Sequence, residues 1–259
     1  MKKQENRYLY GPVSSWRLGR SLGIDALSGK KKNCSFNCVY CQIGRAAPCP
    51  KRRKIFVPTK KIIDELKRFP RVPIDYLTFS GMGEPTLAKN LGQIIKHIRK
   101  IRREKIAVIT NSSLIDNAQV RKEIKLADLV MAKLDCCGPE LLNKVNHPVG
   151  SVTFDKMVRG LKKLRSEYKG KLALQIMFVK ENKKFASRIA EIAKDIAPDE
   201  VQINTPLRKN KCAPLSKQEI AEIKKFFHGF NIVSVYDQKR KKTKPISSKE
   251  TVRRRGQKD

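Results

Sequence analysis

From about residue 59 onward, short apolar runs alternate with helical patterns, and this alternation constrains the fold more than any other feature of the chain. Apolar runs bounded by turn residues are typical of buried strands, and the segments between them have helical spacing. The runs lie at residues 74–79, 106–110, 129–134, 172–179 and 201–204. Strands that alternate with helices predict an α/β fold, in which crossover helices connect the strands of a parallel sheet.

Two of the intervening segments show the helical period clearly, because apolar residues recur three or four positions apart and so share one face. Ser216 and Glu219 have the spacing of a capping box before a further helix, and Thr59 and Asp116 are predicted N-caps of two earlier helices. The apolar positions of the two periodic segments are Leu91, Ile94, Ile95 and Ile98, and Phe185, Ile189, Ile192 and Ile196.

A first strand at residues 21–24 brings the predicted strand and helix units to six, and residues 231–236 are a candidate for a final strand. Six units are too few for a closed eight-fold barrel. We therefore expect an open, partial (β/α)6 TIM-like barrel that forms one domain over residues 1–238. Residues 239–259 lose the pattern and are mostly basic, so we expect them to form a mobile tail.

The chain carries 58 Lys and Arg against 24 Asp and Glu, a formal net charge of +34, and most of the excess lies outside the predicted tail. Such a surface attracts polyanions. The sequence contains no apolar run near the roughly 20 residues of a membrane helix, so we expect no membrane partner. Residues 1–7 lack the apolar stretch of a secretory signal, which predicts a cytoplasmic protein with reduced cysteines.

Three of the seven cysteines, Cys34, Cys38 and Cys41, fall within eight residues. In a reducing compartment such clustering points to metal binding or catalysis. A structural zinc site takes four ligands. A four-iron cluster bound by three cysteines keeps one iron open for another molecule. The spacing favours the open cluster over two alternatives, a set of reduced core thiols and a zinc knuckle completed by Cys49.

A second motif, Ser-Gly-Met-Gly-Glu-Pro at residues 80–85, directly follows the predicted strand 74–79. The carboxyl ends of barrel strands carry ligand sites. Gly81 and Gly83 permit a close approach of the backbone to a ligand, and Glu84 offers hydrogen-bond acceptors. The alternative is an ordinary turn from strand to helix.

The two motifs together, with Tyr40 before the last cysteine, resemble those of the radical S-adenosylmethionine (radical SAM) superfamily. The flanking residues are most similar to the wyosine-synthase-like iron-sulfur oxidoreductases, a group named for a tRNA-modifying member. The likeness extends from about residue 10 to residue 236. The segments that carry it are residues 10–13, 17–25, 34–45, 80–85, 110–112, 133–135, 146–148 and 204–207.

The resemblance implies that Cys34, Cys38 and Cys41 ligate a [4Fe-4S] cluster and that SAM chelates the fourth iron. It implies an external one-electron reductant, such as flavodoxin or ferredoxin, and cleavage of SAM to methionine and a 5'-deoxyadenosyl radical that abstracts hydrogen from a substrate. The SAM contacts that it implies, together with weaker candidates on later strands, are Tyr40, Gly81, Met82, Gly83, Glu84, Asn111, Ser112, Gln175 and Asn204.

Several further residues are candidates for other roles. Lys133 is a candidate catalytic lysine, with an ion pair to Asp135 as the structural alternative. The tRNA-modifying namesake holds a second cluster with cysteines upstream of the radical motif, whereas no cysteine precedes Cys34 here. The candidates for an auxiliary cluster, whose alternative role is that of small apolar side chains, are Cys49, Cys136, Cys137 and Cys212.

The basic charge makes tRNA or another RNA a candidate partner, since phosphate contacts dominate affinity for nucleic acids and aromatic rings stack on unpaired bases. Trp16, Arg17 and Arg20 are candidate nucleic-acid contacts. We expect a radical SAM enzyme that modifies a tRNA base. Two alternatives stay open: a radical SAM enzyme for a peptide, protein residue or small metabolite, and a non-catalytic protein that binds metal and nucleic acid. The sequence does not predict the oligomeric state.

Overall fold

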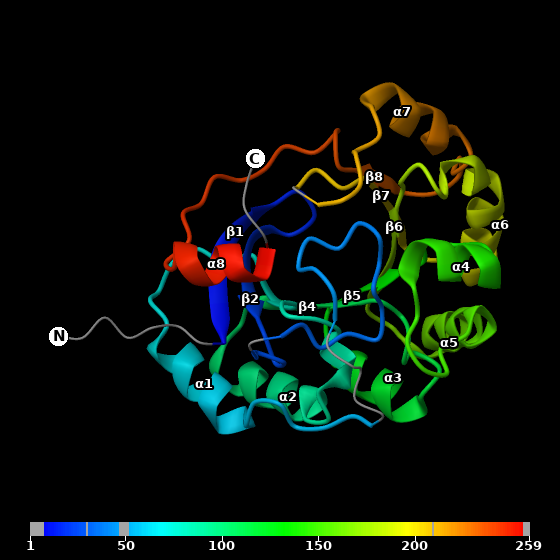
Figure 1. The fold of residues 1–259 in the computed structure, drawn as a ribbon. Helices are drawn as coiled ribbons and strands as arrows, with labels where there is room; N and C mark the ends of the chain where they lie inside the picture. The colour runs from blue at the N-terminus through cyan, green and yellow to red at the C-terminus, as the bar shows by residue number, and fades with distance from the viewer. Residues whose placement is uncertain (1–7, 30, 47–51, 209, 256–259) are drawn as a thin grey trace.

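The computed structural model of the chain describes residues 8–29, 31–46, 52–208 and 210–255. Its strands form a single sheet in the order β1 to β8, in which β2 to β8 are parallel and β1 is antiparallel to β2. The sheet curls into a half-barrel with β1 and β8 at its two edges (Figure 1). The strands are β1 Leu9–Ser15, β2 Gly19–Ile24, β3 Tyr76–Phe79, β4 Lys105–Thr110, β5 Leu129–Lys133, β6 Lys171–Met177, β7 Glu200–Asn204 and β8 Ile232–Ser234.

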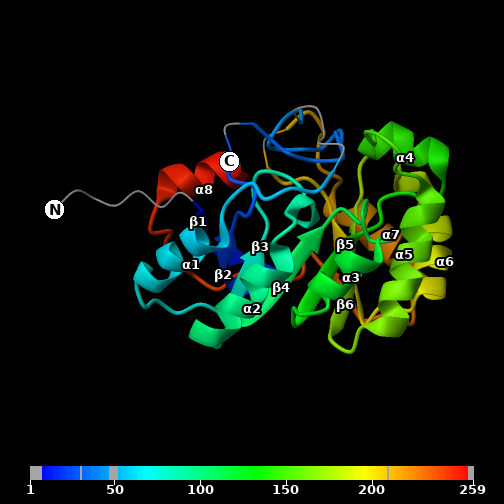
Figure 2. The same cartoon turned by 90° about the horizontal axis from the view of Figure 1, so that it is seen from below.

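Most of the helices cover the outer face of the curled sheet, as the two views in Figures 1 and 2 agree, whereas the last helix lies beside β1. Apolar side chains of these helices and of the sheet form the main core between the two layers. The helices are α1 Thr59–Arg68, α2 Leu91–Ile101, α3 Ala118–Ile124, α4 Pro139–Asn146, α5 Phe154–Glu167, α6 Ala186–Ile196, α7 Lys217–Lys225 and α8 Ser248–Arg255, and the 3-10 turns are η1 Pro85–Leu87 and η2 Lys183–Phe185.

The predicted partial barrel and its strands are confirmed, with bounds shifted by a few residues, and the candidate final strand at 231–236 appears as β8. Strand β1 was not predicted. Its Gly11 and Pro12 interrupt the strand pattern, and the pairing with β2 changes register between Tyr10 and Val13. Proline has no N–H to donate to a ladder, so it is tolerated at bulges and edges.

The predicted helix faces are largely confirmed. The four apolar positions of α2 are completely buried, and so are Ile189 and Ile196 of α6, whereas Phe185 and Ile192 are partly buried. The capping box of Ser216 and Glu219 is present at the start of α7. These positions face the sheet because the helical period and the apolar period coincide.

The two other predicted N-caps are wrong by one residue. Asn117, and not Asp116, caps α3 by accepting from the N–H groups of Gln119 and Val120. Asp116 pairs instead with Arg159 on α5. Helix α1 begins at Thr59, with Pro58 at the N-cap position.

The loop that follows β2 carries the three clustered cysteines; we call residues 31–46 the cysteine loop. Its backbone pairs with the turn after β3, because Asn33 N–H donates to Met82 O (2.8 Å) and Glu84 N–H donates to Asn33 O (2.9 Å). Gly83 lies at this contact with φ of +143°, and a Cβ there would lie 1.6 Å from the carbonyl oxygen of Asn33. Only glycine fits at such a close approach.

The other side of the cysteine loop pairs with the end of α4. Val39 N–H donates to Val145 O (2.9 Å), and Asn37 N–H donates to Asn146 O (3.0 Å). The loop is therefore fixed on both sides, at the carboxyl ends of the parallel strands.

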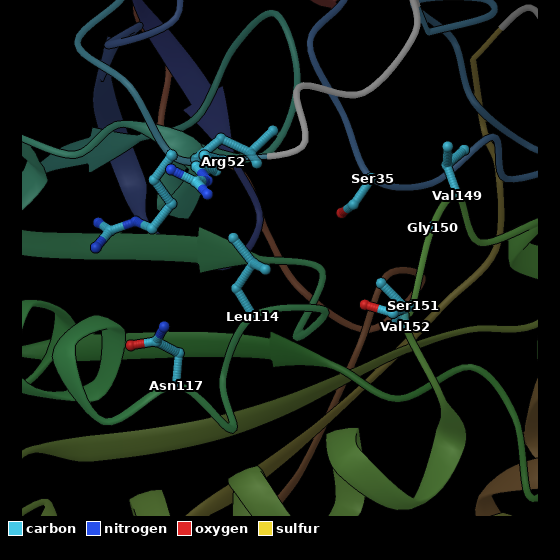
Figure 3. A pocket seen from close by; sticks show the side chains of 10 residues that line it. Ser35, Arg52, Leu114, Asn117, Val149, Gly150, Ser151 and Val152 are labelled. Atoms are coloured by element: carbon cyan, nitrogen blue, oxygen red, sulfur yellow. The ribbon is translucent and has the colours of Figure 1, made fainter.

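A pocket of about 630 Å³ borders the loop at Ser35 and is also lined by Leu114, Asn117 and Ser151 (Figure 3).

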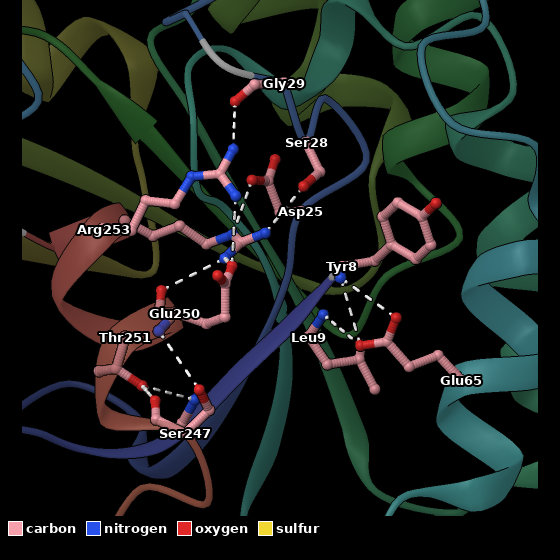
Figure 4. A network of polar contacts seen from close by, with 12 residues as sticks. Tyr8, Leu9, Asp25, Ser28, Gly29, Glu65, Ser247, Glu250, Thr251 and Arg253 are labelled. Carbon is pink, nitrogen blue, oxygen red and sulfur yellow. Dashed lines mark hydrogen bonds and ion pairs between the residues drawn. The ribbon is translucent and has the colours of Figure 1, made fainter. Parts of the chain in front are cut away.

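The carboxyl-terminal segment differs from the expected tail. Residues 248–255 form helix α8, and the Arg254 side chain is completely buried, with its Nε 2.8 Å from Asp25 Oδ2 and its Nη2 2.8 Å from Ser28 Oγ (Figure 4). The expectation of a mobile tail is thus wrong for α8. Periodicity does not reveal this helix, because α8 has almost no apolar face and is held by a buried ion pair.

The segment before and within α8 also covers the free edge of β1. Ile246 N–H donates to Gly11 O (2.8 Å), and Gly11 N–H donates to Thr251 Oγ1 (3.1 Å). Covering an edge strand satisfies its unpaired backbone groups. Among the helices that the structure describes, none has the length and apolar character that a bilayer crossing requires.

The buried ion pair predicts a large effect of Arg254→Leu on stability. This change leaves the Asp25 carboxylate buried without its cation, which costs about 3–5 kcal/mol in the free energy of unfolding. Urea unfolding followed by Trp16 fluorescence measures the loss. Arg159→Leu, which breaks the exposed pair with Asp116, is the matched control and should have a small effect. Equal losses in the two variants would contradict the structural role of α8.

The contact of Gly83 with Asn33 predicts that Gly83→Ala destabilises the protein by at least about 3 kcal/mol, because the two backbones must separate. Gly150→Ala is the control. Gly150 also has a positive φ, of +80°, but a Cβ there meets no atom within 4 Å, so only the backbone strain of about 1 kcal/mol remains. Chemical denaturation compares the two variants, and similar losses would show that the close approach is unimportant.

Candidate metal and cofactor site

The cysteine loop places Cys34, Cys38 and Cys41 on one short turn between β2 and α1, with Cys34 buried and the other two partly exposed. Cys41 N–H donates to Cys38 O (3.0 Å) inside the turn. Lys32 links the two ends of this segment, because its buried ammonium donates hydrogen bonds to the carbonyl oxygens of Phe36 and Gly44, both at 3.1 Å. The loop thus holds three thiols beside one buried positive charge.

Two asparagine side chains donate hydrogen bonds to these thiols. Asn111, after β4, has its Nδ2 3.5 Å from Cys34 Sγ, and Asn146, at the end of α4, has its Nδ2 3.3 Å from Cys38 Sγ. Hydrogen bonds to the sulfur atoms of a metal site orient them and tune the bound metal. Asn111 was a predicted site residue, but Asn146 was known only as part of a similar segment.

Burial is the largest influence on the pKa values of Cys34 and Cys38. It raises the pKa of Cys34 to about 12, against the opposing charge of Lys32. Burial likewise raises the pKa of Cys38. Thiolates are the form that binds a metal, so loading this site must release protons.

The donor set fits a cluster that takes one thiolate at each of three irons, because three thiols share one loop and two of them have amide donors. Among the described residues, no three His, Cys, Asp or Glu side chains are grouped so as to hold a single metal ion. Cys49, the fourth ligand of the zinc alternative, lies outside the described residues.

Glu84, on the motif after β3, is buried and makes four hydrogen bonds within the protein. Its Oε1 accepts from Thr86 N–H (3.0 Å), Thr86 Oγ1 (2.7 Å) and Thr110 Oγ1 (2.7 Å), and its Oε2 accepts from Asn111 N–H (2.6 Å). Burial raises the pKa of Glu84, and these donors oppose the rise. Glu84 therefore holds the end of β4 against the Gly81–Gly83 turn and is a positioning residue for both.

Tyr40, on the cysteine loop, is buried and donates its hydroxyl hydrogen to Asp135, which follows β5. Asn146 Nδ2 lies 3.1 Å from the Tyr40 hydroxyl and 2.9 Å from Asp135 Oδ2. Burial, and then the charge of Asp135, raises the pKa of Tyr40. Asp135 was not predicted as a site residue, although its place after a strand end was a usable signal.

Lys133 forms an ion pair with Asp135, which was the structural alternative to a catalytic role for this lysine. Its Nζ lies 3.3 Å from Asp135 Oδ1 and 5.0 Å from the centre of the Tyr40 ring. Its side chain is only 14% exposed. Lys133 thus helps Asp135 to hold the orientation of Tyr40.

The remaining predicted cofactor contacts lie on or directly after β4, β6 and β7. Ser112 donates to Lys133 O (2.9 Å), and Asn204 Oδ1 accepts from Thr205 N–H (2.9 Å). Gln175 on β6 differs from both, because its buried Nε2 has no hydrogen-bond partner among the described residues. An unpaired buried donor costs free energy unless a water or ligand accepts from it. The protein itself therefore leaves one donor of Gln175 unused.

Three of the four candidate auxiliary cysteines lie in or against one small core, which also contains Cys34. Cys136 is completely buried in the small core beneath the cysteine loop, with Leu141 and Leu142, and burial raises its pKa. Cys137 and Cys212 are partly buried against the same core. Of the four, Cys49 falls outside the described residues. Cys136 therefore has the surroundings of an apolar core residue.

The candidate nucleic-acid contacts lie at the hairpin of β1 and β2. Trp16 and Arg17 occupy the turn, where the Arg17 guanidinium carbon lies 5.0 Å from the centre of the Trp16 ring. Arg20 pairs with Asp75 at 3.1 Å. The structure thus compensates the charge of Arg20 but places no carboxylate against Arg17 within the described residues.

Comparison with known proteins identifies the family. The pattern of the Radical SAM superfamily matches residues 31–196, which is more than half of the chain and includes both motifs. The UPF0026 protein slr1464 of Synechocystis is 43% identical over 201 residues, which cover 77% of this chain and 76% of that protein.

Solved structures share the half-barrel. Streptococcus suis SuiB bound to S-adenosylmethionine matches with a TM-score of 0.62 and 12% identity, over 79% of this chain and 48% of that one. Archaeal TYW1 matches with a TM-score of 0.57 and 14% identity, over 82% and 72%. The chain spans about half of SuiB, and at these identities the likeness establishes the fold. With its thiol loop, glycine turn and matched family pattern, the chain belongs to the radical SAM superfamily of enzymes.

Proposed function

We propose that this radical SAM enzyme modifies a tRNA base by abstracting hydrogen from it. A [4Fe-4S] cluster held by the three cysteines and reduced by an external one-electron donor, such as flavodoxin or ferredoxin, would supply the electron for reductive cleavage of SAM, with methionine and 5'-deoxyadenosine as products once a hydrogen atom has left the substrate. The observation that carries the proposal is the loop of three thiols beside the Gly81–Gly83 turn.

In that scheme the residues of this chain would bind the cluster and SAM, orient them and shield them from solvent. Cys34, Cys38 and Cys41 would ligate three irons, and the amides of Asn111 and Asn146 would stabilise the ligated sulfur atoms. The turn after β3 and the unpaired Nε2 of Gln175 would contact SAM.

Tyr40 has a separate role in the scheme. Its hydroxyl is committed to Asp135, so its ring is held in one orientation. A ring that is fixed in this way offers an apolar face to an adenine.

Charge and fold support a tRNA substrate. The net charge of +34 exceeds what a small-molecule site requires, and it would attract a polyanion over the whole surface. The structural likeness to archaeal TYW1 is consistent with the similarity to wyosine-synthase-like enzymes in the flanking residues. A peptide or a small metabolite is the rival substrate, and it predicts SAM cleavage that does not respond to RNA.

Cys38→Ala should abolish both the visible absorbance of the reconstituted cluster and dithionite-driven formation of 5'-deoxyadenosine, because it removes one of three iron ligands. Anaerobic reconstitution with iron counting and chromatography measures the two effects. Cys212→Ala is the matched control and should keep about four irons per chain. Retention of either signal by Cys38→Ala would refute the ligand assignment, and about eight irons in the wild type with a loss in Cys212→Ala would reveal an auxiliary cluster.

Bulk tRNA should stimulate 5'-deoxyadenosine formation, because an enzyme holds its radical chemistry back until the substrate completes the site. The stimulation should weaken as salt rises, since phosphate contacts are salt-dependent. Heparin at matched charge is the control for a non-specific polyanion. If tRNA and heparin act alike, or neither acts, the substrate belongs to another chemical class.

A further inference from the structure

Four arginines approach one another near the gap between the two edges of the half-barrel. Arg17 comes from the hairpin of β1 and β2, Arg208 follows β7, Arg240 lies on the segment that leads from β8 back to β1, and Arg255 ends α8. The segment of Arg240 is tied to the hairpin because Ser14 Oγ donates to Lys241 O. Arg208 Nη1 donates to Arg255 O at 2.7 Å. Distant parts of the sequence therefore bring these charges together.

This arginine cluster, which we define as Arg17, Arg208, Arg240 and Arg255, lacks acidic partners. No carboxylate among the described residues forms an ion pair with any of the four. Several arginines elsewhere in the structure do have such partners. The pairs are Arg20 with Asp75, Arg53 with Glu123, Arg99 with Asp128, Arg121 with Glu167, and Arg165 with Asp199.

Three of the four arginines, Arg17, Arg208 and Arg255, are partly buried. Placing their charges together without a counter-ion therefore costs free energy. The Nε of Arg17 is buried and has no hydrogen-bond partner among the described residues, while its guanidinium stacks on Trp16. Burial, and then the charges of Arg255, Arg208 and Arg240, lowers the pKa of Arg17 to about 10. Burial and the charge of Arg255 lower the pKa of Arg208 to about 10 as well. Like charges that share a desolvated site repel one another until an anion binds.

Tyr10 connects this region to the cofactor site. Its ring lies 5.5 Å from the guanidinium of Arg254, the neighbour of Arg255, and its hydroxyl is 2.6 Å from Ser80 Oγ. Ser80 directly precedes the glycine turn at Gly81. Tyr10 also interacts electrostatically with Arg17, Arg208 and Arg255, so its side chain lies beside both the arginine cluster and the residue that precedes the glycine turn.

We propose that Arg17, Arg208 and Arg255 form a binding site for a phosphate group of the substrate. Arginine matches phosphate because its planar guanidinium donates two parallel hydrogen bonds, and Trp16 offers a ring on which a neighbouring base can stack. The arginine cluster itself is independent of the proposed function, but the statement that the phosphate belongs to the substrate rests on it. The phosphate belongs either to an RNA backbone or to a free nucleotide, and the chemistry of recognition is the same.

Binding measurements with the double variant Arg17→Gln/Arg208→Gln test the site. The control is Lys100→Gln/Arg103→Gln, which removes two exposed charges at the end of α2. The probes are a fluorescent single-stranded RNA 12-mer and GTP. We expect the cluster variant to bind at least one probe about tenfold more weakly than the control. For the RNA, the slope of log affinity against log salt should fall by about 0.7 for each lost phosphate contact.

Thermal unfolding gives a second readout that does not need a nucleotide. Sodium pyrophosphate should raise the Tm of the wild type and of the control more than that of the cluster variant, because a ligand of the native state stabilises it. The single variant Arg208→Gln serves if the double variant does not fold, with Arg103→Gln as its control.

The outcomes separate this inference from the proposed function. Weaker RNA binding supports a phosphate of the RNA backbone, and weaker GTP binding alone supports a free nucleotide. Equal binding of both probes and equal Tm shifts in the cluster and control variants overturn the site. Formation of 5'-deoxyadenosine by the same wild-type preparation is measured separately, so the absence of SAM cleavage would overturn the proposed function without deciding about the phosphate site.

Discussion

The contact between the backbones of Gly83 and Asn33 is the constraint on which the arrangement of the site depends. It joins the loop that carries the thiols to the turn that follows β3, two segments about fifty residues apart, at a distance that excludes any side chain. Glu84 then ties the same turn to the end of β4 through buried hydrogen bonds. Because parallel strands end at one edge of the sheet, these few contacts bring the thiols, the glycine turn and the amides of Asn111 and Asn146 together.

A second set of contacts supports the site from the opposite direction. The Asp25 carboxylate accepts a hydrogen bond from Leu27 N–H and pairs with Arg254 of α8, and Gly81 packs so closely on it that a Cβ there would lie 2.5 Å from Asp25 Cγ. One buried acid thus connects the end of β2, the glycine turn and the carboxyl-terminal helix. Burying a charge is costly unless it is paired and hydrogen-bonded, so each of these partners is required by the others.

The sequence predicted what depends on periodicity and on short motifs. The strands β2 to β8 and the apolar faces of α2 and α6 follow from spacing along the chain, and the two motifs mark the cysteine loop and the turn after β3. It missed β1, where Gly11 and Pro12 break the strand pattern, and α8, where an Arg-rich helix has almost no apolar face. The sequence analysis also missed Asp135. The role of this residue depends on its hydrogen bonds with Tyr40 and Asn146, which are not its neighbours in the sequence. Contacts between distant polar side chains leave no periodic signal.

The position of α8 has a consequence for how the protein matures in the cell. Arg254 comes after every strand in the sequence, whereas its partner Asp25 directly follows β2. During synthesis the ribosome releases all three clustered cysteines long before it releases the helix that neutralises Asp25. A nascent chain therefore exposes the cysteine loop before the Asp25 carboxylate can pair with Arg254. Iron that is delivered after α8 has formed this ion pair reaches a loop whose neighbouring acid is already neutralised.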